Sequence, residues 1–182
     1  ELGNLSRQLL HYTDDIGEKK AESAKRKLHS LNPHCRVEAL HEAISEDNGE
    51  MLVGDAHLIV DGTDNLETRR ILNRVSLKKG VPFFFGGVDG LTGMATTFMP
   101  GKTPCFECLF PDGTPDKGPP GVLGPLPGII GALQALAAIN FLVGVPHGLL
   151  TGRMLYMDGA TMNFKMIEMG KNSRCRVCGT DL

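Results

Sequence analysis

Four of the five cysteines lie in two short pairs whose spacing suits a metal ion. Cys105 and Cys108 form one C-x-x-C pair, and Cys175 and Cys178 form the other. Four thiolates satisfy the tetrahedral preference of Zn²⁺ and leave no position for water or substrate, so such a zinc is structural. Disulfides and a redox pair are the alternatives, but a chain with no visible secretory signal is expected to keep its thiols reduced. The cysteines therefore predict a zinc site that joins a loop to the C-terminal tail.

A carboxylate follows the most apolar of the predicted strands. Residues 57–61, His-Leu-Ile-Val-Asp, are typical of a strand buried on both faces, and Asp64 and Asn65 come soon after it. Two interpretations stay open for Asp64. It is either the N-cap of the next helix, with Glu67 as its capping-box partner, or a Mg²⁺ ligand beside a nucleotide phosphate at the carboxyl end of a strand.

The N-terminal part of the chain carries basic residues. Residues 19–20 and 25–27 lie on a predicted helix, and such a run is typical of a solvated helix face. Lys20 is near the helix N-terminus, where a cation is unfavourable unless an anion such as a phosphate lies nearby. Arg7 is, from composition alone, an ordinary surface arginine. Cys35, in the segment after Pro33, is expected to be a small buried residue rather than a nucleophile.

Strand-like and helix-like segments alternate along the chain. Helices are predicted from about residue 14 to 31 and over 65–79, and strands over 35–40, 57–61, 81–85, 94–98, 153–158 and 163–169. This alternation predicts an α/β, Rossmann-like, mostly parallel sheet with helices on both faces. Ligands of such sheets bind beyond the carboxyl ends of the strands. The Gly/Pro-rich residues 110–127 are expected to form a mobile loop.

The longest apolar run, residues 128–145, has to be assigned to a membrane or to a protein core. It is barely long enough to cross a bilayer and contains Gln134 and Asn140, so we expect a core helix. Its small residues are expected to allow close packing on a sheet; they are Gly131, Ala132, Ala135 and Ala138.

Composition narrows the function classes. The chain has 182 residues, 41% of them hydrophobic, and a net charge of -2, which fits one soluble domain and gives no basic surface for nucleic acid or an anionic membrane. No signal peptide is visible at Glu1, so a cytoplasmic location is expected.

Together these motifs resemble the MoeB/ThiF family of adenylating enzymes, relatives of ubiquitin-activating enzymes. The resemblance runs through the whole chain, and the matching segments are residues 1–8 (ELGNLSRQ), 17–24 (GEKKAESA), 61–65 (DGTDN) with Arg69, the two cysteine pairs, and 121–126 with 131–135.

The resemblance implies ATP-dependent adenylation of the C-terminal glycine of a small ubiquitin-like sulfur-carrier protein of the MoaD or ThiS kind. Arg7 and Lys20 then face the phosphates, Asn4 helps to bind the nucleotide, Asp64 binds Mg²⁺, and Asn65 lines the same pocket. A homodimer is also implied.

Two departures from the family pattern are visible. The family's Gly-rich phosphate loop lies upstream of the motif in which this chain begins, so we expect residues 1–182 to be a single adenylation domain that is N-terminally incomplete. Lys117 stands about where many relatives carry a cysteine, which favours a role limited to adenylation.

Two other functions remain as alternatives. The first is a non-catalytic, zinc-stapled module that binds a ubiquitin-like protein without a working ATP site. The second is a nicotinamide-dependent oxidoreductase, which has no support because no G-x-G-x-x-G motif opens a helix here.

Overall fold

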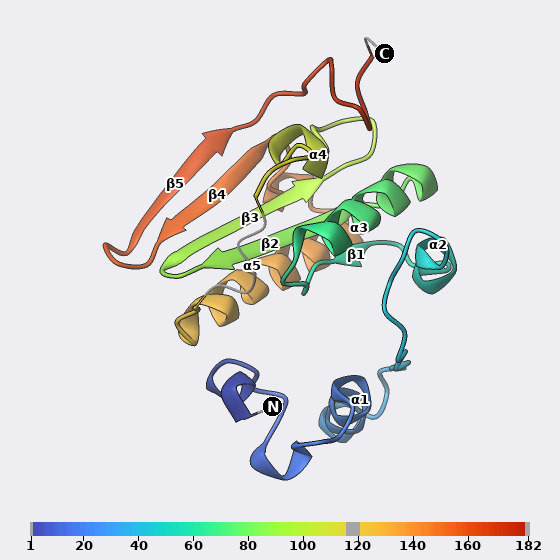
Figure 1. The fold of residues 1–182 in the computed structure, drawn as a ribbon, viewed down its shortest axis with the longest axis vertical. Coiled ribbons are helices and arrows are strands. Elements are labelled where there is room, and N and C mark those ends of the chain that lie inside the picture. Colours follow the sequence, from blue (N-terminus) through green and yellow to red (C-terminus); the bar gives the residue numbers. More distant parts are fainter. Residues whose placement is uncertain (1, 116–120, 181–182) are drawn as a thin grey trace. The chain divides into compact units, whose positions relative to one another are not determined.

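The computed structural model describes residues 2–115 and 121–180 (Figure 1). The chain divides into two compact units, Glu1–Ala43 and Ile44–Leu182, each with its own internal packing. The prediction of one adenylation domain over residues 1–182 concerns the whole chain and stays a prediction.

The first unit is built from short helices. Two 3₁₀ helices, η1 (Leu2–Ser6) and η2 (Thr13–Asp15), precede α1 (Lys20–Leu31). The predicted helix began at residue 14, but Gly17 adopts a left-handed φ of +93°, which breaks the segment and delays the α-helix to Lys20.

The strand predicted over residues 35–40 is wrong. This described segment has neither helix nor strand, and none of the strands in the described chain pairs with it. A strand needs a neighbour to satisfy its backbone groups, so the alternating pattern is not sufficient alone. Cys35 is exposed rather than buried, which corrects the expectation for its thiol.

The second unit contains a five-stranded sheet with the order β1-β2-β3-β4-β5. The strands are β1 (Ile59–Val60), β2 (Phe83–Asp89), β3 (Thr92–Phe98), β4 (Arg153–Asp158) and β5 (Asn163–Glu168). The helices of this unit are α2 (Gly49–Val53), α3 (Leu66–Lys79), α4 (Phe106–Leu109), α5 (Pro125–Leu142) and η3 (Pro146–Gly148). The α/β class is confirmed.

The described sheet is mixed rather than mostly parallel. β1 and β2 are parallel, whereas β2–β3, β3–β4 and β4–β5 are antiparallel. The turn after β2 explains the first antiparallel pair: Asp89 pairs with Thr92, and Gly90 between them has a left-handed φ of +57°. Such a tight hairpin cannot make a parallel pair, which needs a crossover of about a dozen residues or more.

The phenylalanines of β2 explain why helices cover both faces of the sheet. Phe83 and Phe85 pack in one cluster with Leu72 of α3 and Phe106 of α4, whereas Phe84 packs in another with residues of α5. Neighbouring strand residues point to opposite faces, so a run of three phenylalanines needs apolar partners on both (Figure 1).

The two-residue strand β1 is buried on one face only. Ile59 is 8% exposed but Val60 is 48% exposed, so the expectation of burial on both faces is wrong at Val60.

Helix α3 ends at Lys79, as its sequence predicts, and begins at Leu66, one residue after the predicted start. Asn65 caps its first turn, and Gly80 ends it with a left-handed φ of +69°.

Helix α5 packs on the sheet along one side and is exposed along the other. Its buried residues are Leu126, Ile130, Gln134, Ala137 and Ala138. Leu136, Ile139 and Leu142 are more than half exposed, so only part of the predicted burial is present. α5 is also long and apolar enough to cross a membrane, but the buried Gln134 bonds to the sheet, which favours the core-helix interpretation.

The close packing of α5 depends on glycines of the strands and on only one of the predicted small residues. Ala138 is buried and packs with Phe84, as predicted, whereas Gly131, Ala132 and Ala135 are exposed, so the prediction is wrong for these three. A Cβ on Gly86 or Gly93 would instead lie 2.3 Å from Gln134 or 2.7 Å from Ile130.

Candidate functional site

The loop that joins β1 to α3 begins with a buried carboxylate. The side chain of Asp61 is 0% exposed. Its Oδ1 accepts hydrogen bonds from the backbone N–H and the hydroxyl of Thr63, at 2.8 and 2.7 Å, and its Oδ2 accepts one from Nε of Arg69 at 2.8 Å. Both oxygens are therefore occupied by groups of the protein.

Arg69 joins this loop to the helix and to the sheet. Besides its ion pair with Asp61, its Nη2 donates to the carbonyl oxygens of Thr63 (2.6 Å) and Gly86 (3.1 Å). Its guanidinium lies 5.1 Å from the ring centre of Phe85. One side chain thus connects the loop, α3 and β2.

Gln134 of α5 fixes the same region from the other face of the sheet. Its Nε2 donates to the carbonyl oxygens of Asp61 (2.8 Å) and Phe84 (2.9 Å). The absence of a side chain at Gly86 makes room for this amide. The carboxyl end of β1 and the neighbouring part of β2 are therefore bonded to one helix residue.

Asp64 is exposed at this edge of the sheet. The N-cap of α3 is Asn65, whose Oδ1 accepts from the N–H of Thr68 at 2.8 Å, so the N-cap interpretation of Asp64 is wrong. The Nδ2 of Asn65 lies 3.5 Å from Asp64 Oδ1. An exposed carboxylate at the carboxyl end of a parallel strand is the donor type that Mg²⁺ prefers.

In the first unit, Asn4 lies on η1 and Arg7 follows directly after its last residue, Ser6. Arg7 Nη2 donates to Asn4 Oδ1 at 3.1 Å, and its Nη1 donates to the Gly3 carbonyl at 3.2 Å. The short helical turn places these side chains side by side because they are three residues apart.

Lys20 is the first residue of α1 and is exposed, so its predicted position near the helix N-terminus is confirmed. It lines a small hollow with Asn4, but Arg7 is not among the lining residues. The hollow measures about 30 Å³. This is far below the roughly 300 Å³ of the smallest usual ligand pockets, so it is not a nucleotide site by itself.

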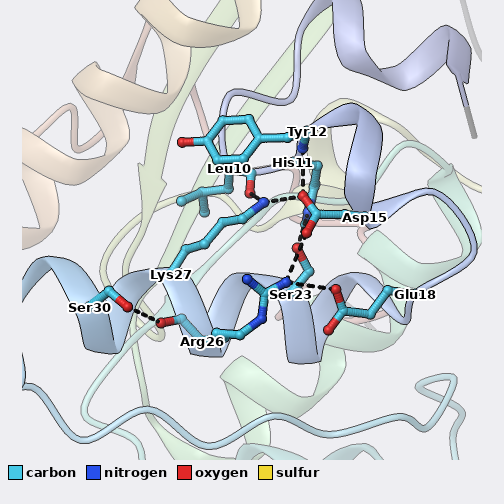
Figure 2. A network of polar contacts seen from close by, with 9 residues as sticks. All are labelled: Leu10, His11, Tyr12, Asp15, Glu18, Ser23, Arg26, Lys27 and Ser30. Carbon is cyan, nitrogen blue, oxygen red and sulfur yellow. Dashed lines mark hydrogen bonds and ion pairs between the residues drawn. The ribbon is translucent and has the colours of Figure 1, made fainter.

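The basic run on α1 is more than a solvated face. Asp15 pairs with both Arg26 and Lys27, and it accepts from the N–H of Tyr12 at 2.5 Å (Figure 2). Lys27, which is 13% exposed, also lies over the Tyr12 ring. Two hydrogen bonds lower the pKa of Asp15: the one from Lys27 has the largest effect and the one from the backbone of Tyr12 the next largest. The solvated-face prediction is therefore wrong for Lys27.

The four paired cysteines converge in the second unit, as predicted. Sγ of Cys105 lies 3.9 Å from that of Cys108 and 3.8 Å from that of Cys175, and the Cys108 and Cys178 sulfurs are 3.4 Å apart. Four sulfurs on a tetrahedral zinc, each bonded at about 2.3 Å, are separated by roughly 3.8 Å. All four are free thiols, so the residues fit zinc better than disulfides.

The surroundings of these thiols affect how they ionise. Burial raises the pKa of Cys105 well above its usual range, and burial raises the pKa of Cys178 to about 11. Bound zinc displaces these protons, so metal binding is expected to release them and to weaken as the pH falls.

Two further polar residues lie behind the first cysteine pair. Asn73 of α3 accepts the N–H of Phe106 at 3.0 Å, and Glu107, which is 7% exposed, lies 3.4 Å from Nε of Arg70. The turn of residues 105–108 is thus joined to α3, the helix whose first turn follows Asp64. Sequence reasoning missed Glu107, although its place inside a C-x-x-C turn was a usable signal.

Two other regions contribute nothing to the predicted site. A larger cavity of about 560 Å³ lies between the end of β3 and the C-terminal end of α5, lined by residues such as Met99 and Phe141. It contains none of the predicted site residues, and it lies beyond the end of β3, where Phe98 pairs with Phe83 at the start of β2. Lys117 and part of the loop expected to be mobile lie outside the described residues.

Comparisons with known proteins agree with the family that the motifs resemble. The sequence profile of the ThiF family matches residues 1–177. The chain is 39% identical to the SAMP-activating enzyme E1 of Haloferax volcanii over 184 residues, covering 98% of this chain and 67% of the relative. It is 35% identical to the sulfur carrier protein adenylyltransferase of Thermus thermophilus over 191 residues, covering 100% and 70%.

Other relatives are considerably longer than this chain. The adenylyltransferase and sulfurtransferase MOCS3 of Culex quinquefasciatus is 37% identical, but the match covers only 42% of its length. Among solved structures, Escherichia coli MccB with ATP superposes with a TM-score of 0.86 at 24% identity, covering 98% of this chain and 56% of that one. This likeness confirms the fold, and the chain spans little more than half of that enzyme.

Proposed function

Because the chain belongs to the ThiF family, we propose that it catalyses the ATP-dependent adenylation of a ubiquitin-like sulfur-carrier protein. The names of two relatives, a SAMP-activating enzyme and a sulfur carrier protein adenylyltransferase, support this substrate class. In the reaction, a carboxylate oxygen at the carrier's C-terminal glycine forms a bond to the α-phosphorus of ATP. The bond between the α-phosphorus and the oxygen that joins it to the β-phosphorus breaks, and pyrophosphate leaves with the electron pair of that bond.

Repulsion between the carboxylate and the triphosphate is the main obstacle to this reaction. Catalysis therefore depends mostly on charge neutralisation and positioning. We assign phosphate neutralisation to Arg7 and Lys20 and nucleotide binding to Asn4, with Asn65 lining the pocket. Bound Mg²⁺, with Asp64 as its ligand, supplies further positive charge to the phosphates.

One observation carries the assignment of Asp64. The two carboxylates of the 61–65 loop are in opposite states, since Asp61 is buried and paired with Arg69 whereas Asp64 is exposed. Only the exposed one is available to a metal ion, and it lies at the edge of the sheet where ligands of such folds bind.

The zinc site has a separate role. Four cysteine ligands complete the coordination of Zn²⁺, so we assign it to structure and not to the reaction. It joins residues 105–108 to residues 175–178, which are far apart in sequence.

ATP–pyrophosphate exchange with a MoaD- or ThiS-type carrier, run on the full-length protein, tests the proposal. Exchange is expected in the wild type and is expected to be lost in Asp64→Ala, with zinc content unchanged. Wild-type protein with bound zinc, a native circular dichroism spectrum and no exchange would contradict adenylation and favour the non-catalytic module. Exchange that survives in Asp64→Ala would show that the Mg²⁺ assignment is wrong.

A cytoplasmic location and a homodimer are further parts of the proposal. The exposed apolar side of α5 supports a subunit contact, since Leu136, Ile139 and Leu142 are each more than half exposed. Light scattering of the full-length protein tests the dimer, and a monomer at micromolar concentration would contradict it.

A further inference from the structure

We propose that Arg69 is a positioning residue for the metal–nucleotide complex, because its ion pair with Asp61 fixes the loop that presents Asp64. This inference rests on the proposed function, in which Asp64 binds Mg²⁺. Arg69 itself contacts neither the metal nor the nucleotide in this proposal. Its effect passes through the backbone of the 61–65 loop.

The ion pair between Asp61 and Arg69 is buried. The side chain of Asp61 is 0% exposed and that of Arg69 is 13% exposed. A buried charge is costly unless it is paired and hydrogen-bonded. Asp61 has three hydrogen bonds to its two oxygens, so the pair is fully satisfied and its geometry is well determined.

Arg69 forms hydrogen bonds with both the 61–65 loop and strand β2. Nη2 donates to the carbonyl of Thr63 in the loop and to that of Gly86 in β2, while Nε donates to Asp61. A planar guanidinium with several fixed donors suits such a set of acceptors, whereas a lysine ammonium is a point charge on a flexible stem. The contacts therefore require arginine and not merely a positive charge.

Arg69 lies near the N-terminus of its helix, where a positive charge is unfavourable. It lies in the first turn of α3, which begins at Leu66. A cation near a helix N-terminus is unfavourable against the helix dipole, so Arg69 does not serve the stability of α3 itself. Its bonds to the loop and to β2 offset that cost.

The hydrogen bonds of Arg69 and Asp61 reach the residue next to Asp64. Thr63 immediately precedes Asp64, and three of its groups are bonded: its N–H, its hydroxyl and its carbonyl. On the other side of Asp64, Asn65 is fixed as the N-cap of α3. The backbone of Asp64 is therefore held between two fixed residues. Loss of Arg69 removes the bond to the Thr63 carbonyl and the ion-pair partner of Asp61, which accepts the other two Thr63 bonds.

The test uses Arg69→Lys in the full-length protein, with Arg74→Lys as the matched control. Arg74 lies on the same helix and pairs with Glu46 on the surface, with 41% of its side chain exposed. The first readout is the affinity of the protein for Mn²⁺ in the presence of ATP, measured by water-proton relaxation. Loss of a residue that orients a metal ligand typically weakens metal binding by about 10- to 100-fold, and we expect this for Arg69→Lys and no change for Arg74→Lys.

A second readout separates positioning from general damage. In the exchange reaction, Arg69→Lys is expected to raise the Mg²⁺ concentration needed for half-maximal rate, to leave the KM for the carrier unchanged, and to regain activity at high Mg²⁺. Zinc content and circular dichroism are expected to match the wild type. If Arg69→Lys does not fold, the double variant Asp61→Asn/Arg69→Gln, which removes both buried charges, is measured in the same way.

The outcomes distinguish this inference from the proposed function. Wild-type Mn²⁺ affinity in a folded Arg69 variant, with binding lost in Asp64→Ala, would overturn the inference and leave the function standing. Absence of Mn²⁺–ATP binding in the wild type would overturn both. Equal weakening in the Arg69 and Arg74 variants would also overturn the inference.

Discussion

Among the described residues of the first unit only Ser23 is buried, whereas the second unit encloses Phe83, Phe84 and Phe85 with at most 1% exposure. The predicted phosphate-binding residues, Arg7 and Lys20, belong to the first unit, and the predicted metal ligand belongs to the second. The first unit is therefore held together by polar contacts near its surface, and the second by an apolar core and a cysteine cluster. The residues of one proposed site thus depend on different interactions: polar contacts hold the unit that carries Arg7 and Lys20, and an apolar core supports the unit that carries Asp64.

The largest expected effect comes from removing a metal ligand of the second unit. Cys178→Ser is expected to lose zinc and to unfold the second unit at a much lower temperature, because structural zinc contributes an apparent binding free energy of about 10–16 kcal/mol in small domains. Metal analysis measures the zinc content, and calorimetry measures the unfolding temperature. Cys35→Ser, which changes an exposed thiol, is the control and is expected to match the wild type. A stable, metal-free Cys178→Ser protein would refute the structural zinc site.

The next effect comes from the apolar core. Phe85→Ala is expected to lower the free energy of unfolding of the second unit by about 3–5 kcal/mol, since it leaves a cavity among packed rings. Leu31→Ala changes a side chain of the first unit that is 82% exposed. It is expected to change the free energy of unfolding of the first unit by less than about 0.5 kcal/mol. Urea denaturation followed by circular dichroism checks both values. Similar losses for the two variants would remove the contrast between the units.

A smaller effect sharpens the account of the sheet edge. Gly86→Ala is expected to destabilise by about 1–3 kcal/mol, because the new methyl group meets the Gln134 amide that bonds to Asp61. Gly131→Ala on the exposed side of α5 meets no atom within 4 Å and is expected to stabilise by up to about 1 kcal/mol. Thermal denaturation of the two variants gives opposite signs if the packing is as described, and a stabilising Gly86→Ala would contradict it.

The smallest effect concerns the polar network of the first unit. The folded chain lowers the pKa of Asp15 through its hydrogen bond with Lys27, so the stability from this carboxylate is complete above the usual aspartate pKa of about 4. It is lost as the pH falls below that value toward the lower folded pKa. The protection of α1 amides against hydrogen exchange, corrected for the intrinsic pH dependence of exchange, is therefore expected to fall below about pH 4, and this fall is expected to disappear in Asp15→Asn. Unchanged pH dependence in Asp15→Asn would contradict the network.

The sequence predicts what depends on local pattern or fixed spacing. The cysteine pairs, helix α3 with its glycine end, and strands β2 to β5 are present in the structure. Residue type and spacing are sufficient for these because cysteine pairs and glycine ends each have a narrow set of physical uses.

The sequence could not predict what depends on distant partners. The pairing of Asp61 with Arg69 and Gln134 follows from burial, which no local pattern reveals. The failed strand over 35–40 has the same cause, since alternation predicts a face but not a neighbouring strand. Asp61 and Asp64 lie within one short motif, yet only tertiary contacts distinguish the exposed carboxylate of Asp64 from the buried one of Asp61.

A crystal structure of the full-length protein with Mg²⁺ and a non-hydrolysable ATP analogue tests the central claim most directly. The account predicts one nucleotide whose phosphates contact Arg7 and Lys20 and whose Mg²⁺ is bound by Asp64. A nucleotide bound without any of these three residues would contradict the account.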